Sequence, residues 1–402
     1  MDAVAPVCRA VREEGEAALR RFSQQFDHVV PDHFRVDPAI AGQCADNLEP
    51  GLRTSLETAI ARRRAVCAVE ADIPDSWVDV APGARVGIRS IPVSRVGLYV
   101  PGGLAPLASS VIMNVVPAQA AGVASLAVAS PPQADGLPHP TILAVCHLLG
   151  VEEIYAVGGA QAVAMFAYGV DGLCPSVDMV TGPGNIYVVA AKRLVKGVIG
   201  IDSEAGPTEI AILADDSASP VYIAADLLSQ AEHDPQAGSV LVTDCETLAD
   251  QVEAELTGMV AETLHRQRVA TALGGPQSAI LLVRDMVQGT EVVNAYAAEH
   301  LEIHTQNAAD LAARIHNAGA IFVGSYSPVS LGDYSAGSTH VLPTSGTARH
   351  SSGLTVRSFF KTVHVIDYDA SALEQIAGEI ETFALAENLP AHAHAIAVRR
   401  DS

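Results

Sequence analysis

Polar side chains interrupt an otherwise apolar stretch, DLLSQAEHD (226–234), whose spacing predicts a helix. Gln230 and His233 are three positions apart, so on a helix they leave the same face and can reach one atom together. An imidazole nitrogen and a carboxamide oxygen can both bind zinc, although Gln is an uncommon ligand. In a structural interpretation, the His interacts with the helix dipole and the Gln satisfies a backbone group. The spacing alone leaves both interpretations open.

A carboxylate and an imidazole stand side by side in AEHLEIH (298–304), just before a predicted strand. On a helix, neighbours such as Glu299 and His300 point about 100° apart, so they suit two acid/base tasks better than one metal ion. The zinc-protease pattern HExxH is absent, because Glu302 follows His300 by two positions. The alternative is a solvated Glu beside a His at the edge of the core.

Two further regions carry residues that could do chemistry. The stretch 326–355 is rich in Gly, Ser, Thr and Pro, and it contains Asp333 and His340. A loop of that length in a compact domain is more often functional than accidental, although a lone Asp is usually a turn residue. Near the C-terminus, Glu387 and His392 have Pro390 between them, so they need not share a helical face.

Glycine-rich loops follow predicted strands at 96–103, 156–162 and 180–188. Each offers backbone N–H groups where a strand gives way to a helix, which favours binding of a phosphate or a dinucleotide. None fits GxGxxG, so no Rossmann fingerprint is present, and ordinary tight turns remain an alternative.

The elements that must position these residues alternate between strands and helices, which predicts an α/β fold with parallel sheets. Helices over 2–26 and 50–70 should form an N-terminal cover. A strand at 362–366 and a helix should follow the Gly-rich stretch. The strands of the sheets are predicted at 96–100, 125–130, 153–157, 177–181, 209–214, 239–243, 279–283 and 320–324.

Composition excludes several classes of protein. Apolar residues make up 49% of the 402 residues and charged residues 17%, which is typical of a globular protein. A formal net charge of −22 disfavours nucleic acid and anionic membranes as partners. The six cysteines are dispersed without a CxxC pair, which argues against a disulfide framework or a thiolate zinc site. Neither a signal peptide nor a long apolar run is apparent, so we expect a cytoplasmic protein.

Taken together, these stretches resemble the histidinol dehydrogenase family, and in detail the sequence is similar to its actinobacterial members. The matches run in order from about residue 90 to residue 392. The matching motifs are VGLYVPGG, SSVIMNVVPAQAAGV, VGGAQAVA, TGPGNIYV, EAGPTEIAILAD, DLLSQAEHD, AAEHLEI, SLGDYSAGSTHVLPT, SSGLTV and AENLPAH.

The resemblance implies a zinc- and NAD-dependent oxidation of L-histidinol to L-histidine through L-histidinal, the last steps of histidine biosynthesis. It implies one Zn²⁺ per subunit and two NAD per turnover. By resemblance the catalytic pair is Glu299 and His300. The other implied residues are the zinc ligands Gln230, His233, Asp333 and His392, the substrate-binding residues Thr208, Gln230, His233, His300, Asp333, Glu387 and His392, and the NAD-binding residues Tyr99, Gln161 and Asn185.

The expected architecture is a homodimer with two Rossmann-like domains in each chain. Residues 1–104 and 209–355 should form the first, which carries most zinc and catalytic residues, and 105–208 an inserted second on the NAD side. By resemblance, the tail 356–402 completes the partner's active site. Family members usually carry a further N-terminal stretch, which helps to exchange domains in the dimer.

Three alternatives stay open. One is a paralogue that oxidises another alcohol, such as a sulfonated diol, with the same zinc and NAD. Glu387 favours an amino alcohol instead, because it can pair with an ammonium group. The others are a zinc hydrolase in which Glu299 activates water, and a noncatalytic binding protein.

Overall fold

The chain divides into two compact units. The structure is a computed structural model that describes residues 1, 3–102, 106–204 and 206–400. The first unit comprises Met1–Ala71 and Val93–Phe359, and the second comprises Asp72–Pro92 and Phe360–Ser402. No helix within these described ranges is long and apolar enough to cross a bilayer.

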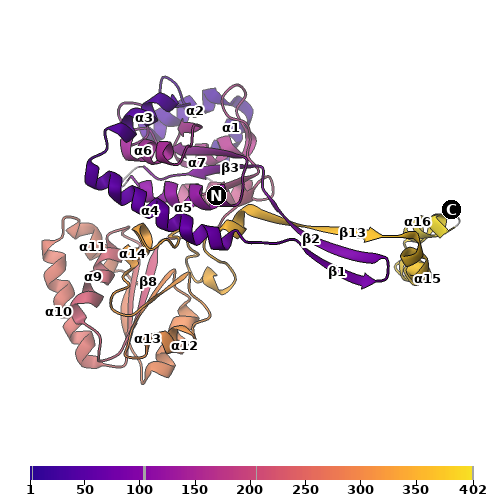
Figure 1. The fold of residues 1–402 in the computed structure, drawn as a ribbon. Helices are drawn as coiled ribbons and strands as arrows, with labels where there is room; N and C mark the ends of the chain where they lie inside the picture. The colour runs from indigo at the N-terminus through magenta and orange to yellow at the C-terminus, as the bar shows by residue number, and fades with distance from the viewer. Residues whose placement is uncertain (2, 103–105, 205, 401–402) are drawn as a thin grey trace. The chain divides into compact units, whose positions relative to one another are not determined.

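A five-stranded parallel sheet forms one half of the first unit, with the order β5-β4-β3-β6-β7. Helices α1 (Ala5–Glu14), α7 and α8 share one apolar cluster with this sheet. Figure 1 shows α7 beside β3. The strands are β3 (Arg95–Tyr99), β4 (Ser125–Ser130), β5 (Ile154–Ala156), β6 (Met179–Thr181) and β7 (Gly200–Ile201), and the helices are α5 (Ala108–Ala120), α6 (Pro140–Leu148), α7 (Gly159–Tyr168) and α8 (Ile186–Val195).

The other half of the unit is a second five-stranded parallel sheet, with the order β10-β9-β8-β11-β12. Its strands are β8 (Glu209–Ala214), β9 (Gly238–Thr243), β10 (Ala279–Leu282), β11 (His300–His304) and β12 (Ala320–Val323). Its helices are α9 (Pro220–Ala231), α10 (Glu246–Glu262), α11 (Arg266–Leu273), α12 (Met286–Tyr296), α13 (Ala308–Ala312) and α14 (Val329–Tyr334).

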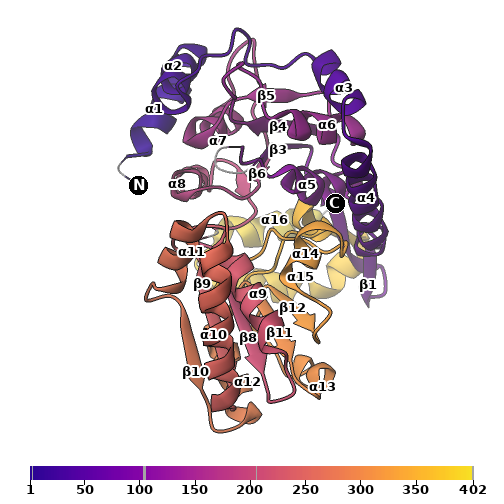
Figure 2. The same cartoon turned by 90° about the vertical axis from the view of Figure 1, so that its left-hand side faces the viewer.

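Both faces of the second sheet are covered, as parallel sheets require. Ile210 and Ile212 of β8 pack with α9 and α10, whereas Ala211 and Leu213 pack with α12 and α13 on the opposite face (Figures 1 and 2). Alternate residues of a strand point to opposite faces, so each strand of this sheet has an α9 face and an α12 face.

The N-terminal helices are α1 (Ala5–Glu14), α2 (Glu16–Phe22), α3 (Pro38–Asp46) and α4 (Pro50–Glu70), with a π-helical turn at Ser23–Asp27. The predicted single helix over 2–26 is therefore divided, because Gly15 has a φ of 57° that a right-handed helix cannot contain. Asp2, where that prediction began, lies outside the described residues.

The second unit is an antiparallel sheet with the order β1-β2-β13, followed by two helices. Its elements are β1 (Ser76–Ala81), β2 (Ala84–Pro92), β13 (Phe360–Tyr368), α15 (Ala370–Ala386) and α16 (Pro390–Arg400). The sequence analysis anticipated β13 and the helical tail but not β1 and β2, although the hairpin turn at Gly83 has the positive φ typical of such turns.

The predicted α/β fold with two parallel sheets is confirmed. One strand differs in its place: β3 pairs with β4 and β6, so it belongs to the sheet that contains 125–201 rather than to the sheet of 209–323. The expected domain of residues 1–104 and 209–355 would instead place this strand with the sheet of 209–323. Residues 103–105 themselves lie outside the described ranges.

Candidate active site

Glu299 lies buried at the start of β11, and it is held by the start of β8. The Thr208 hydroxyl and the Glu209 backbone N–H, at 3.1 Å, both donate to Glu299 Oε2. Burial raises the pKa of Glu299 to about 8, although these two hydrogen bonds oppose the shift. The carboxyl group can therefore exchange a proton at mildly alkaline pH.

The backbone around Glu299 is fixed by the start of β12. Ala320 N–H donates to the carbonyl of Glu299 at 2.9 Å. A Cβ on Gly319 would lie 2.5 Å from that same carbonyl oxygen, so only glycine fits there. The approach of β12 thus prevents the carboxylate from shifting along its strand.

His300 is the first residue of β11, and its ring has one nitrogen in use and one free. Nδ1 lies 3.2 Å from the Glu209 carbonyl oxygen, which requires the proton to be on Nδ1. Nε2 is buried and has no hydrogen-bond partner among the described residues. Burial lowers the pKa of His300, so the ring is neutral at pH 7 and Nε2 carries an available lone pair. This is the arrangement of a general base.

Gln230, His233 and Asp333 converge beside this pair. Gln230 Nε2 donates to Thr208 Oγ1 at 2.6 Å, which leaves the buried Oε1 without a partner. His233 Nε2 lies 4.0 Å from Asp333 Oδ2. Burial raises the pKa of Asp333, while His300 and His233 oppose that shift. An unpaired amide oxygen, an imidazole and a carboxylate form a donor set that suits zinc.

The helix predicted to carry both Gln230 and His233 includes only Gln230. Helix α9 ends at Ala231, because Pro235 restricts the backbone before it and cannot continue the helix. Gln230 is buried at 2% exposure, whereas the His233 side chain is 46% exposed. The two residues come together through the turn after the helix, where His233 N–H donates to the Gln230 carbonyl.

Two of the predicted NAD-binding residues, Tyr99 and Gln161, lie at the end of β3 and in the helix after β5. The Gly159 N–H donates to the Tyr99 hydroxyl at 3.1 Å, and burial raises the pKa of Tyr99 to about 12. Gln161, in the first turn of α7, is buried and donates through Nε2 to Asp27 Oδ2 at 3.4 Å. A polar surface thus gathers at the carboxyl ends of this sheet, where open α/β sheets bind their ligands.

The third predicted NAD-binding residue, Asn185, begins α8. Its Oδ1 accepts from the backbone N–H groups of Tyr187 and Val188 at 3.0 and 3.2 Å, so it is the N-cap of that helix. Gly182, just after β6, has a φ of 116°, and a Cβ there would meet the Tyr99 carbonyl oxygen. The loop of Asn185 can therefore lie directly against the end of β3.

Comparison with known proteins shows the family to which the chain belongs. The family model for histidinol dehydrogenase matches residues 1–400. The chain belongs to the histidinol dehydrogenase family. A histidinol dehydrogenase of Cutibacterium acnes is 66% identical over 100% of this chain and 93% of the relative, and one of Thermobifida fusca is 59% identical over 99% and 91%. A crystal structure of histidinol dehydrogenase from Elizabethkingia anophelis is 32% identical, has a TM-score of 0.93 and covers 99% of this chain and 91% of that one.

Two residues that the family resemblance implies belong to the second unit. Glu387 directly follows α15, and His392 lies in the first turn of α16; both are exposed. Their part in a histidinol dehydrogenase site stays a prediction.

Sequence reasoning missed three residues that support the site. Glu209 fixes both His300 and Glu299 through its backbone, and Asp27 contacts Gln161. His340 was noted without a role: its Nε2 lies 3.2 Å from Ser110 Oγ, and its Nδ1 lies 3.3 Å from the Asp333 carbonyl oxygen. The position of Glu209 at the start of a buried strand was the available signal.

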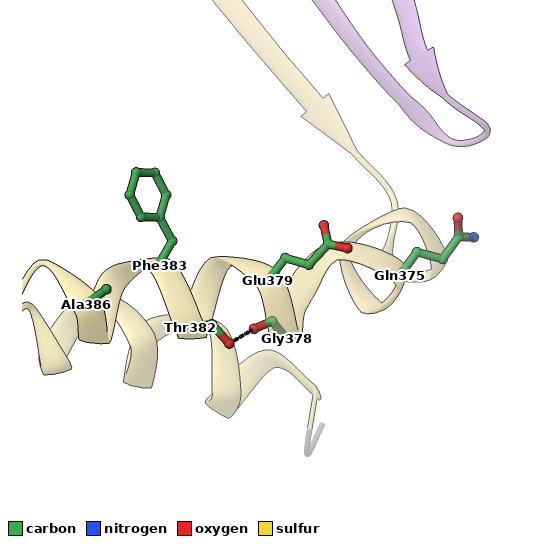
Figure 3. A pocket seen from close by; sticks show the side chains of 6 residues that line it. All are labelled: Gln375, Gly378, Glu379, Thr382, Phe383 and Ala386. Atoms are coloured by element: carbon green, nitrogen blue, oxygen red, sulfur yellow. Dashed lines mark hydrogen bonds between the residues drawn. The ribbon is translucent and has the colours of Figure 1, made fainter.

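A shallow hollow lies on α15 in the second unit. Its lining includes Phe383 and Glu379, and Thr382 donates to the Gly378 carbonyl at 2.7 Å (Figure 3). None of its lining residues was predicted to belong to the site. Phe383 is 68% exposed there, which is unusual for an aromatic side chain on a helix.

Proposed function

We propose that this chain is a cytoplasmic histidinol dehydrogenase. It oxidises L-histidinol to L-histidine through L-histidinal, with one zinc ion per subunit and two NAD per turnover. The observation that carries the proposal is the buried His300, whose free Nε2 shares one site with a carboxyl group of raised pKa, Glu299. Membership of the family supports the substrate.

The residues present fit zinc. Gln230 Oε1 is buried and unpaired, as a group that awaits a ligand should be, and His233 and Asp333 supply one nitrogen and one oxygen donor. His392 from the second unit is the proposed fourth ligand. When bound, zinc supplies an electrophile that orients the imidazole and amine of the substrate.

His300 moves the proton in both oxidation steps. Its Nδ1–H is held by the Glu209 carbonyl, so Nε2 faces the substrate and takes the hydroxyl proton as the alcohol becomes the aldehyde. In the second step Nε2 takes a proton from the hydrated aldehyde. When bound, NAD supplies the hydride acceptor in each step.

Glu299 activates the water that hydrates the aldehyde. The Thr208 hydroxyl and the Glu209 N–H hold Oε2, which leaves the other oxygen to accept a proton from water. Burial excludes bulk solvent, so the activated water meets the aldehyde rather than exchanging away.

The first test is the number of NADH formed for each L-histidinol consumed by the zinc-loaded protein at mildly alkaline pH. We expect two. A value of one would remove the second oxidation from the proposal. None, with zinc bound and NAD binding intact, would mean that the site serves another alcohol.

We further propose a homodimer in which the tail 356–402 of one subunit contributes Glu387 and His392 to the other. Apolar side chains exposed on the second unit support an interface with a second copy, because exposed patches of this kind usually mark interaction surfaces. They include Trp77, Val78, Val80, Ile366, Phe383 and Leu385.

Mixed dimers test this arrangement. A chain truncated after Leu385 should be inactive with its first unit still folded, and His300→Gln should also be inactive. Co-expression of the two should restore activity, because the truncated chain's intact His300 receives a tail from its partner. Normal turnover by the truncated chain, or mixed dimers without activity, would contradict a shared site.

A further inference from the structure

Three polar side chains line one face of the central strand β11. His300, Glu302 and His304 alternate with Leu301 and Ile303, which pack on the α12 face of the sheet. The polar residues therefore point to the α9 face. Glu302 and His304 are 0% and 2% exposed. Polar groups rarely occupy the covered face of a central strand unless a partner compensates their burial.

The partner that the chain itself supplies is another carboxylate. Asp226 of α9 offers an oxygen within 4.8 Å of the ligand atoms of Glu302 and His304. His304 Nε2 lies 3.1 Å from Glu302 Oε2, and Glu302 Oε1 accepts from the Val329 N–H at 2.8 Å. No Lys or Arg makes a salt bridge to Asp226 or Glu302 in the described part of the chain.

The charges do not balance with these three residues alone. Asp226 and Glu302 bring two carboxyl groups within 4.8 Å of each other, and no Lys or Arg of the described residues pairs with either of them. His304 also lacks a hydrogen bond: its Nδ1 is buried and has no partner in the described ranges. Two carboxylates and one imidazole match the charge and the donor preference of a divalent transition ion.

We propose that Asp226, Glu302 and His304 bind a divalent cation, such as Mn²⁺ or Zn²⁺, separately from the proposed catalytic zinc. Asp226 is only partly buried, so its side gives the ion a path from solvent and room for water ligands. The Val329 N–H orients Glu302 from outside the ligand set, as supporting groups do in metal sites.

An ion bound at this site would affect the arrangement of the candidate active site. Asp226 precedes Gln230 by one turn of α9, and Glu302 follows His300 by two residues on the same strand face. An ion shared by Asp226 and Glu302 therefore ties the helix of a proposed zinc ligand to the strand of the proposed base. It positions these groups without touching the substrate.

Cation counting tests the proposal without using turnover, so the result does not depend on the proposed function. The protein is His233→Ala, which disables the proposed catalytic zinc site at a half-exposed residue. After removal of metal with a chelator and dialysis against Mn²⁺ alone, we expect one Mn²⁺ per chain. Adding Asp226→Asn should weaken binding at least 100-fold, whereas Asp250→Asn, an exposed carboxylate on α10, should leave it unchanged. Circular dichroism checks that each variant is folded.

The spectrum of the ion bound to His233→Ala provides a second readout. Electron spin-echo modulation of the Mn²⁺ should show coupling to one imidazole nitrogen, and replacing His304 with Gln should remove it. Absence of bound Mn²⁺ in His233→Ala, or binding that survives Asp226→Asn, would overturn the cation site. In the first case the carboxyl pair holds a proton instead.

Discussion

The two parallel sheets of the first unit have the same winding but use opposite edges. Each starts at its central strand, adds two strands on one side and then two on the other. In the first sheet, Tyr99 is the last residue of β3 and Asn185 follows β6, on either side of the point where the winding reverses. In the second sheet, Thr208 and Glu299 precede the amino ends of β8 and β11, which flank the corresponding point.

In the proposed assignment of the site, a switch point in the winding does not by itself decide where chemistry occurs. Ligands usually bind at the carboxyl edge of an open α/β sheet, and the proposed NAD-binding residues of the first sheet follow that rule. At the amino edge of the second sheet, the last turn of α9 carries Gln230, and the return of the chain at α14 adds Asp333. A helix that follows a parallel strand runs back antiparallel to it, so its last turn lies at the amino edge of the sheet.

The largest effect should come from the amino edge of the second sheet. His300→Gln removes the free Nε2 base, so we expect kcat to fall about 10²- to 10⁴-fold. Zinc content and the Kd for NAD should not change, because His300 is neither a proposed zinc ligand nor a proposed NAD-binding residue. His316→Gln, an exposed imidazole, is the matched control for steady-state kinetics. A fall of less than tenfold would remove His300 from the role of base.

A smaller loss should follow removal of the Thr208 hydroxyl, which orients the Gln230 amide and holds Glu299. Thr208→Ala should weaken zinc binding about 10- to 100-fold in a chelator competition, because groups behind a ligand typically contribute that much. Thr208→Ser keeps the hydroxyl and should bind zinc normally. Equal affinity in both variants would show that Gln230 needs no such support.

The pH dependence of aldehyde oxidation should distinguish the role of Glu299 from that of His300. Burial raises the pKa of Glu299 to about 8, so its base form is scarce at pH 6 and increases as pH rises toward 9. The rate with L-histidinal should rise through that range and then level off. Glu299→Gln should lower this rate more than the rate with L-histidinol and should flatten the pH profile. Equal losses in both steps would contradict the division of labour.

The smallest effect should come from the carboxyl edge of the first sheet. Tyr99→Phe leaves the Gly159 N–H without its acceptor, which costs about 1–3 kcal/mol for a buried donor. We expect KM for NAD to rise about tenfold while zinc affinity stays constant. Tyr187→Phe, on the exposed surface of α8, controls for the loss of a hydroxyl. A change in zinc affinity instead would mean that the two edges are not independent.

Much of the fold could be predicted because the strands are short, apolar and bounded by glycine. The run EIAILA gives β8 with its predicted bounds, since a parallel strand covered on both faces needs apolar residues throughout. The hairpin of β1 and β2 was missed because side chains such as Trp77 and Val78 are exposed on both faces of β1, so no regular alternation marks it.

The candidate site could be predicted only in part. The types of residue at Gln230, His233, Glu299 and His300 indicate metal and acid/base chemistry, but the helix that the spacing predicts stops before His233. The contact of His233 depends on where α9 ends, and that end depends on Pro235 and the turn before β9. The sequence did not indicate a role for Glu302 and His304 in the same motif. Their contact with Asp226 of α9 became apparent only in the structure.

The sequence by itself determined the class of fold, the family and the residue types available for chemistry, because these depend on local apolar patterns and short motifs. Only the tertiary structure decided that Thr208, Gln230 and Glu299, from three separate segments, share one hydrogen-bonded group. The tertiary structure also decided the protonation of Glu299 and His300. Burial raises the pKa of Glu299 and lowers that of His300, and burial depends on which elements pack together rather than on neighbours in the chain.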